Sequence, residues 1–236
     1  MFTGPNISTD GLVLALDAAN PKSYPGSGTT WTDLSGNGNN GTLTNGPTFS
    51  STNGGSIVFD GTNDYIGIPY NSNLAPTTAI SFGCVAYLSN WNVVTSMRLL
   101  SKTQNGGYQI GMNEGFNYTT HLGGLVYAGG AYRATKYSLS LISSGWHIII
   151  YTFDGRYFRM YLDAVNVDTF DIGSTVTMSY VVNNSLILGA EAGNGAIPDP
   201  GSYFNGRIAL TQIYNRALSA SEIEQNYNAQ KSRFNL

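Results

Sequence analysis

The chain has 236 residues, of which 42% are hydrophobic and only 11% are charged, with 11 basic and 14 acidic side chains. This apolar fraction is ample for a core and excludes a disordered chain, and the lack of a basic surplus argues against a nucleic-acid partner. The longest apolar stretch, Trp146 to Phe153, is too short to insert into a membrane, and the first residues lack the features of a signal peptide, so we expect a soluble protein made in a cytoplasm.

Segments typical of strands run along the whole chain. They alternate apolar with polar residues and end at Gly, Asn, Asp or Pro, which is the pattern of antiparallel strands with one solvated face. We predict strands over residues 11–18, 55–61, 64–69, 79–89, 97–102, 107–112, 124–129, 146–154, 156–167, 185–190 and 206–216. No helical pattern of about ten residues separates them, so units of strand, helix and strand are not expected. The pattern predicts an all-β fold in which two antiparallel sheets form a sandwich.

Two local signals are stronger than the rest. Asp154-Gly155 joins two strand segments and predicts a hairpin with a two-residue type I′ turn, in which both residues have a positive φ. Near the end of the chain, Ser219 and Glu222 have the spacing of a capping box, in which each side chain satisfies a free backbone N–H of a helix start. We therefore predict a short C-terminal helix over about 219–232, docked on the sandwich.

A loop rich in Gly and Asn follows the first strand, with the sequence WTDLSGNGNNG over residues 31–41. Calcium binds six to eight oxygen atoms, and such loops can turn carboxylate, amide and backbone oxygens onto one point. The candidate ligands are Asp33, Asn37 and Asn39 in this loop, with Asp60 and Asp64 in the segment FDGTNDY. The alternative is a tight corner in which the carboxylates cap free amides. For this loop the sequence favours a tight corner first, a calcium-binding loop second and a sugar-binding loop third. It does not decide among the three.

Glycan binding would need exposed aromatic rings that stack on sugar faces. The candidates, which we place in loops, are Trp91, Tyr118, Tyr127, Tyr132, Tyr137 and Tyr203. The alternative for each is a place in the core or in a subunit interface, where tyrosine supplies contact area at a low cost in entropy.

Catalytic signals are weak. A retaining glycanase needs two carboxylates about 5 to 5.5 Å apart, yet no predicted strand carries Glu-x-Asp or Asp-x-Glu. The two histidines, His121 and His147, lack partners at the spacing of zinc ligands. Motifs for nucleotide binding or for a nucleophilic serine are also missing. We therefore expect no catalytic residues and a protein that is not an enzyme.

Several segments together resemble a known family. LVLALDAANPKSYPGSGTTWTDLSGNGNNGTLTNG, GSIVFDGTNDYIGIP, WHIIIYTFDG and GRIALTQIYNRALSASEIEQNYNAQKSRF occur in this order. They are similar to the laminin-G-like (LamG), concanavalin A-like jelly-roll superfamily, in its microbial and tailed-phage branch. The resemblance implies a jelly-roll sandwich in one domain over residues 11–236, preceded by an N-terminal arm over residues 1–10.

The same resemblance implies a function in ligand binding or as a structural component of an assembly more often than a catalytic one. The opening segment is similar to proteins of tailed phages, so we expect a virion surface protein, such as a capsid decoration, a head fibre or spike, or a tail-associated module. Its expected partners are other virion proteins, further copies of itself in an oligomer, and cell-surface glycans. The alternative is a stand-alone, lectin-like carbohydrate-binding module that depends on calcium; no other cofactor is expected.

Overall fold

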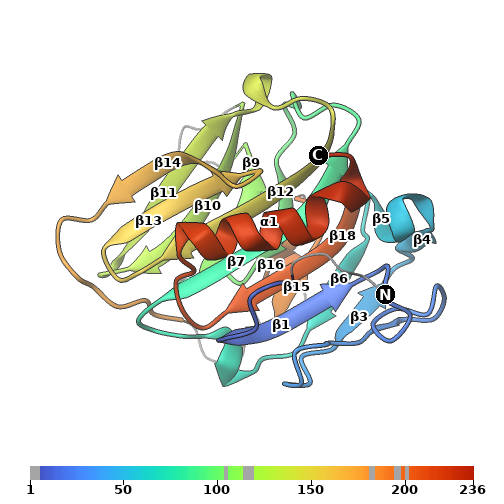
Figure 1. Ribbon diagram of the computed structural model, residues 1–236, viewed down its shortest axis with the longest axis horizontal. Helices are drawn as coiled ribbons and strands as arrows, with labels where there is room; N and C mark the ends of the chain where they lie inside the picture. The colour runs from blue at the N-terminus through green and yellow to red at the C-terminus, as the bar shows by residue number, and fades with distance from the viewer. Residues whose placement is uncertain (1–5, 104–105, 114–119, 181–183, 194–197, 200–201) are drawn as a thin grey trace.

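The computed structural model describes residues 6–103, 106–113, 120–180, 184–193, 198–199 and 202–236. Two eight-stranded antiparallel sheets form a sandwich, and one helix lies on the outside of it (Figure 1). This is the predicted all-β, concanavalin A-like jelly-roll fold. No helix within the described residues is long and apolar enough to cross a membrane.

Sheet A carries the helix. Its strands run in the order β14 (Val165–Asp171), β13 (Tyr157–Leu162), β12 (Gly145–Phe153), β7 (Ile80–Leu88), β18 (Asn205–Tyr214), β5 (Ser56–Asp60) and β4 (Thr48–Ser50), and β1 (Leu12–Asp17) also pairs with β18. The central strands β12 and β7 are buried along almost their whole length, because their inner side chains face sheet B and their outer ones face the helix.

Sheet B lies behind it. Its strands run in the order β11 (Ala131–Ser138), β10 (His121–Ala128), β9 (Tyr108–Met112), β8 (Met97–Ser101), β15 (Leu186–Leu188), β6 (Tyr65–Ile68), β3 (Gly41–Thr44) and β2 (Thr30–Trp31). The short strands β16 (Glu191–Ala192) and β17 (Pro198–Asp199) pair with each other. The described residues also form the 3-10 turns η1 (Thr52–Gly54), η2 (Ser72–Leu74) and η3 (Leu139–Leu141).

Aromatic rings fill the space between the sheets. Phe82 packs against Tyr108 and Tyr151, with ring centroids 4.8 and 5.5 Å apart. Gly124 on β10 lets the sheets approach here, because a Cβ at this position would lie 2.3 Å from the Tyr151 ring. A side chain at Gly124 would therefore push the Tyr151 ring out of the core.

Helix α1 (Ala220–Phe234) crosses the outer face of sheet A, in front of β12, β7 and β18 in Figure 1. Ser219 and Glu222 form the predicted capping box. The helix ends two residues later than predicted, because Phe234 packs on Trp146 with ring centroids 4.9 Å apart. Asn235 then takes a left-handed conformation with a φ of 59° and caps the helix.

The hairpin between β12 and β13 forms, but its predicted type I′ turn is wrong. Gly155 has a φ of 94°, whereas Asp154 is not among the residues with positive φ. The Asp154 carboxylate instead accepts hydrogen bonds from the backbone N–H groups of Arg156 and Tyr157, which favours a longer turn. Two consecutive residues with positive φ occur instead at Asp163 and Ala164, with φ values of 50° and 66°. This turn divides the segment 156–167, predicted as one strand, into β13 and β14.

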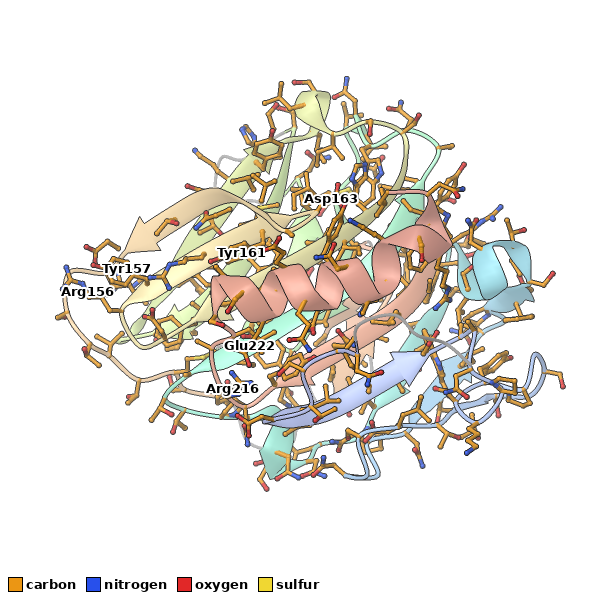
Figure 2. All side chains as sticks on the ribbon, viewed as in Figure 1. Arg156, Tyr157, Tyr161, Asp163, Arg216 and Glu222 are labelled. Carbon is orange, nitrogen blue, oxygen red and sulfur yellow. The ribbon has the colours of Figure 1, made fainter. Side chains whose placement is uncertain are left out.

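The described part of the predicted N-terminal arm, residues 6–10, lies against α1 of the same chain. Ser8 N–H donates to Asn226 Oδ1 at 2.8 Å, and the Ser8 hydroxyl donates to Glu222 Oε1 at 3.1 Å. Arg216 links this segment to the first turn of the helix, because its guanidinium pairs with Glu222 at 2.5 Å and with Asp10 at 2.9 Å. Figure 2 shows Arg216 and Glu222 close together at the start of the helix. Residues 1–5 lie outside the described residues.

Candidate functional site

Asp33 organises the loop over residues 31–41 as a corner. Its Oδ1 accepts hydrogen bonds from the backbone N–H groups of Ala15 and Ser35, both at 2.9 Å. Its Oδ2 accepts from the Ser35 hydroxyl at 2.7 Å and from Asn39 N–H at 3.0 Å. The carboxylate is 8% exposed, so four donors saturate both of its oxygens in a nearly dry environment.

The same loop covers the free edge of β1. Asn39 donates to the Val13 carbonyl at 2.7 Å, Ser35 donates to it at 3.0 Å, and Leu34 N–H donates to the Ala15 carbonyl at 2.8 Å. Asn37 is exposed and donates to the Leu12 carbonyl at 3.3 Å. These groups make hydrogen bonds to backbone carbonyls of β1 that a neighbouring strand would otherwise make. They also prevent this edge of β1 from pairing with a strand of another chain.

The other two candidate calcium ligands lie elsewhere. Asn39 precedes the start of β3, whereas Asp64 lies beside the far end of β3, where Thr44 pairs with Tyr65. Asp60 N–H donates to Asp64 Oδ2 at 3.1 Å. Burial raises the pKa of the Asp64 carboxyl, the hydrogen bond from Asp60 lowers it, and the Asp60 carboxylate raises it further. Within the described ranges, no group of three or more His, Cys, Asp or Glu side chains is placed to hold a metal ion.

The candidate aromatic side chains are scattered. Trp91 is 1% exposed and donates its indole N–H to the Gly145 carbonyl at 3.0 Å, so it is a core residue and offers no ring to solvent. Tyr127 and Tyr132 are paired across β10 and β11, not in loops, with ring centroids 4.9 Å apart. Tyr137 also lies on β11, against the main core. Tyr118 lies outside the described residues.

Tyr127 and Tyr132 are engaged by backbone groups. The Tyr127 hydroxyl donates to the Gly130 carbonyl at 3.1 Å, and the Tyr132 hydroxyl accepts from Gly106 N–H at 3.1 Å. The Tyr127 hydroxyl therefore fixes the turn of the β10–β11 hairpin, and the Tyr132 hydroxyl joins this hairpin to the segment before β9. Tyr127 falls within the strand predicted over 124–129. The expectation of a loop failed for Tyr132 and Tyr137 because Ala131–Ser138 is a partly exposed edge strand with few apolar residues, so it lacks the alternation that predicts a strand.

Tyr203 is the candidate that lines a hollow. This hollow of about 320 Å³ opens where β7 ends and where β8 and β18 begin, and we call it the rim hollow. Its apolar lining comes from Leu88, Val93 and Met97. Its remaining lining residues are Gly61, Ser89, Asn90, Thr95, Tyr203 and Asn205. The sequence offered a signal for this site, since SNWNVVTS (89–96) is a polar loop between two apolar strands.

Fixed neighbours hold Tyr203 in the wall of the hollow. Arg98 N–H donates to the Ser202 carbonyl at 3.1 Å, and the Ser202 hydroxyl donates to Glu191 Oε2 at 3.2 Å. Arg98 pairs with the same Glu191 oxygen at 3.3 Å. The ring of Tyr203 packs on a small cluster that contains Ile187, Ala190 and Ala192. The segment before β18 is therefore attached to β8.

The opposite wall is equally constrained. Gly61 has a φ of 77°, and a Cβ on it would lie 2.7 Å from Asn205 Cβ, so only glycine fits beside Asn205. Within the described parts of the chain, the side chains of Ser89, Thr95, Tyr203 and Asn205 make no hydrogen bond to protein. Their hydroxyl and amide groups are open to a ligand above an apolar floor.

A second polar group has the composition of a hydrolytic triad. His147 Nδ1 lies 2.6 Å from Asp163 Oδ2, and Nε2 lies 3.3 Å from the Ser143 hydroxyl. The nearer contact of Nε2 is the Ser143 carbonyl, at 2.9 Å, and this contact requires an N–H on Nε2. Burial opposes the charge on His147, but the hydrogen bonds to Asp163 and Ser143 together raise its pKa. His147 therefore joins β12 to the turn after β13, and because its Nε2 carries a proton it is a poor base for activating Ser143.

Comparison with known proteins places this architecture in a family. Residues 60–224, more than half of the chain, match Laminin_G_3 of the concanavalin A-like lectin/glucanases superfamily. The chain belongs to this superfamily. The resemblance of its sequence to laminin-G-like domains is thereby confirmed. No curated protein matches the sequence.

Solved structures share the superfamily fold at low identity. Botulinum neurotoxin type C, whose uptake into cells depends on interaction with two ganglioside molecules, matches with a TM-score of 0.70 and 14% identity, over 94% of this chain and 52% of that chain. The binding domain of Paraclostridial mosquitocidal protein 1 matches with a TM-score of 0.66 and 18% identity, over 93% and 52%. The binding domain of botulinum neurotoxin DC, in complex with rat synaptotagmin II, matches with a TM-score of 0.70 and 13% identity, over 94% and 52%. This member of the superfamily spans about half the length of those chains.

Proposed function

We propose that this protein is a non-catalytic, lectin-like module that binds carbohydrate in the rim hollow. The observation that carries the proposal is the position of Tyr203, a partly exposed tyrosine whose hydroxyl is free, in a hollow with an apolar floor. Sugars present an apolar C–H face and a ring of hydroxyl groups, so they suit an aromatic ring beside amides and hydroxyls.

The comparisons support a partner on a cell surface. The structural relatives include a toxin that interacts with gangliosides and a binding domain in complex with rat synaptotagmin II. They share the lectin-like fold with this chain. A glycan partner is consistent with the lining of the rim hollow, which offers neutral hydrogen-bonding groups.

The biological setting we propose is the surface of a tailed-phage particle, where the module would contact other virion proteins and a cell-surface glycan. This setting rests on the similarity of the opening segment, residues 4–28, to proteins of tailed phages. Quantitative mass spectrometry of purified particles tests it. Tens to hundreds of copies per particle would support a decoration or fibre role, and absence from the particles would leave a stand-alone lectin-like module.

Glycan binding is tested by a glycan array followed by calorimetric titration of the strongest ligand. We expect Tyr203→Ala to weaken binding by about tenfold or more, because the stacking surface is lost. Tyr127→Ala is the matched control, since Tyr127 lies on sheet B away from the rim hollow. Both variants must retain the thermal transition of the parent. Equal affinity of the Tyr203 variant and the parent would show that the glycan binds outside the rim hollow.

A further inference from the structure

Among the residues that the structure describes, those that line the rim hollow carry no charged side chain. Its polar groups are the hydroxyls of Ser89, Thr95 and Tyr203 and the amides of Asn90 and Asn205. We propose that the hollow accepts the uncharged end of a glycan and discriminates against acidic sugars, such as sialic acids, uronic acids and sulfated sugars. This inference rests on the proposed function and names the class of ligand.

Most arginine side chains of the described residues are held by acidic partners within the chain. Five arginines form ion pairs within the described residues, namely Arg156 with Asp171, Arg159 with Asp154, Arg216 with Glu222 and Asp10, Arg233 with Asp17, and Arg98 with Glu191. The first pair lies at the far tip of the β12–β13 hairpin, where Figure 2 labels Arg156 and Tyr157. An acidic sugar in the hollow would find none of these groups.

Among the described residues, three charged side chains adjoin the lining of the hollow along the chain or across a strand pair, and none of them offers a site for a carboxylate. Arg98 follows the floor residue Met97, but its guanidinium donates to the Ser96 hydroxyl and to Glu191. Arg207 lies two residues beyond Asn205 on β18, with its guanidinium 5.1 Å from the centre of the Tyr87 ring. Asp60 pairs with Asn205 across β5 and β18 and is exposed. The charge directly opposite Asn205 is therefore negative.

A carboxylate or sulfate group needs strong donors to replace the water it loses on binding. Neutral hydroxyl and amide groups replace the hydration of sugar hydroxyls well but that of an anion poorly. The volume of about 320 Å³ is at the small end of ligand pockets. The ligand that fits is thus one end of a neutral glycan.

The test is to add the missing cation. Thr95 is exposed and lines the hollow, so Thr95→Lys places an ammonium there. Thr177→Lys is the control, because Thr177 is also exposed and lies beyond the opposite end of β12, beside the turn that contains Gly155. Parent and variants are titrated at low salt with a neutral oligosaccharide selected on the array and with its sialylated counterpart.

We expect the parent to bind the neutral oligosaccharide more tightly than the sialylated one. Thr95→Lys should raise affinity for the sialylated form by about two- to fivefold, as expected for one exposed ion pair, and the gain should fall at high salt. Thr177→Lys should change the affinity for neither oligosaccharide. Equal or tighter binding of the sialylated form by the parent, with Tyr203→Ala still defective, would overturn the inference and leave the proposed function intact. No gain from Thr95→Lys over Thr177→Lys would also overturn it, and binding of neither sugar would overturn the proposed function itself.

Discussion

At the scale of single residues, buried polar groups of this protein stabilise loops and turns that carry few apolar contacts. Asp33 holds the loop that covers β1, and His147 joins the start of β12 to the turn at Asp163. Both lie among backbone groups that would lose their partners on substitution. Their contributions can therefore be measured as differences in the free energy of unfolding.

Replacing Asp33 should destabilise the fold with or without calcium. Asp33→Ala leaves the buried N–H groups of Ala15 and Asn39 without acceptors, which should cost about 2 to 3 kcal/mol. Urea unfolding, with calcium and with a chelator, measures the loss. Asp60→Ala is the control, because Asp60 is exposed and caps only Thr62 N–H. A loss at Asp33 that appears only with calcium would support the metal loop instead.

The contribution of His147 should depend on pH. Its pKa is raised in the folded state, so protonation favours folding: the stabilisation is complete below the unfolded value of about 6.5 and is lost as the pH rises through the folded value. Asp163→Asn keeps an acceptor for Ile148 N–H and removes the charge. We expect the difference in unfolding free energy between parent and variant to be largest between pH 5 and 6, in the range set by these values, and to shrink above it. A difference independent of pH would contradict a charged His147.

At the scale of secondary-structure elements, α1 connects both ends of the described chain to sheet A. Its first turn contacts residues 6–10 through Glu222 and Asn226. Its last turn contacts η1 and β1, because Arg233 donates to the carbonyls of Asn53 and Gly55 and pairs with Asp17. The helix therefore depends on tertiary contacts at both ends, in addition to its capping box.

Removing the charge of Glu222 should loosen the N-terminal segment. Hydrogen bonds from Arg216, Ser219 and Ser8 hold the pKa of Glu222 far below its usual range, against the effect of burial. Glu222→Gln should cost about 1 to 2 kcal/mol and raise the rate of amide exchange in residues 6–10, measured by mass spectrometry. Glu224→Gln, on the exposed side of the helix, is the control. Equal exchange in the two variants would show that residues 6–10 do not depend on Glu222.

The same carboxylate makes stability fall in acid. Because the folded pKa of Glu222 is lowered, its contribution is present above the unfolded value of about 4.3 and is lost as the pH falls toward the folded value.

At the scale of the whole molecule, the single cysteine belongs to the main hydrophobic core of the sandwich. Cys84 is on β7, is 2% exposed, and pairs with Ile149 of β12 and Thr211 of β18. Burial raises the pKa of its thiol to about 12. The thiol is therefore both protonated at neutral pH and inaccessible.

Cys84 should report global unfolding. We expect a maleimide or disulfide reagent to modify it only at the rate of global unfolding, because exposing Cys84 requires separation of sheet A from sheet B. Comparing the labelling rate with the unfolding rate measured by fluorescence in urea, extrapolated to water, tests this. Labelling much faster than unfolding would reveal local opening near β7.

The sequence by itself determined the sandwich, most of the central strands and the C-terminal helix with its capping box. These depend on alternation and on short-range hydrogen bonds between residues a few positions apart, such as Ser219 and Glu222. It did not predict β11, whose polar residues lie at a sheet edge, nor the turn at Asp163 and Ala164, which has no glycine. In both places tertiary contacts outweigh local preference.

Only the tertiary structure decided which of the candidate site residues lie close together. It separated Asp33 from Asp60 and Asp64 by the length of β3, buried Trp91, and placed Tyr203 beside Ser89, Thr95 and Asn205 in the rim hollow. Tyr203 and Ser89 are more than 100 positions apart in the chain, and the pairing of β7 with β18 brings their segments together. A sequence pattern encodes local periodicity, whereas a binding site depends on strand order and register, which the packing of the whole sandwich sets.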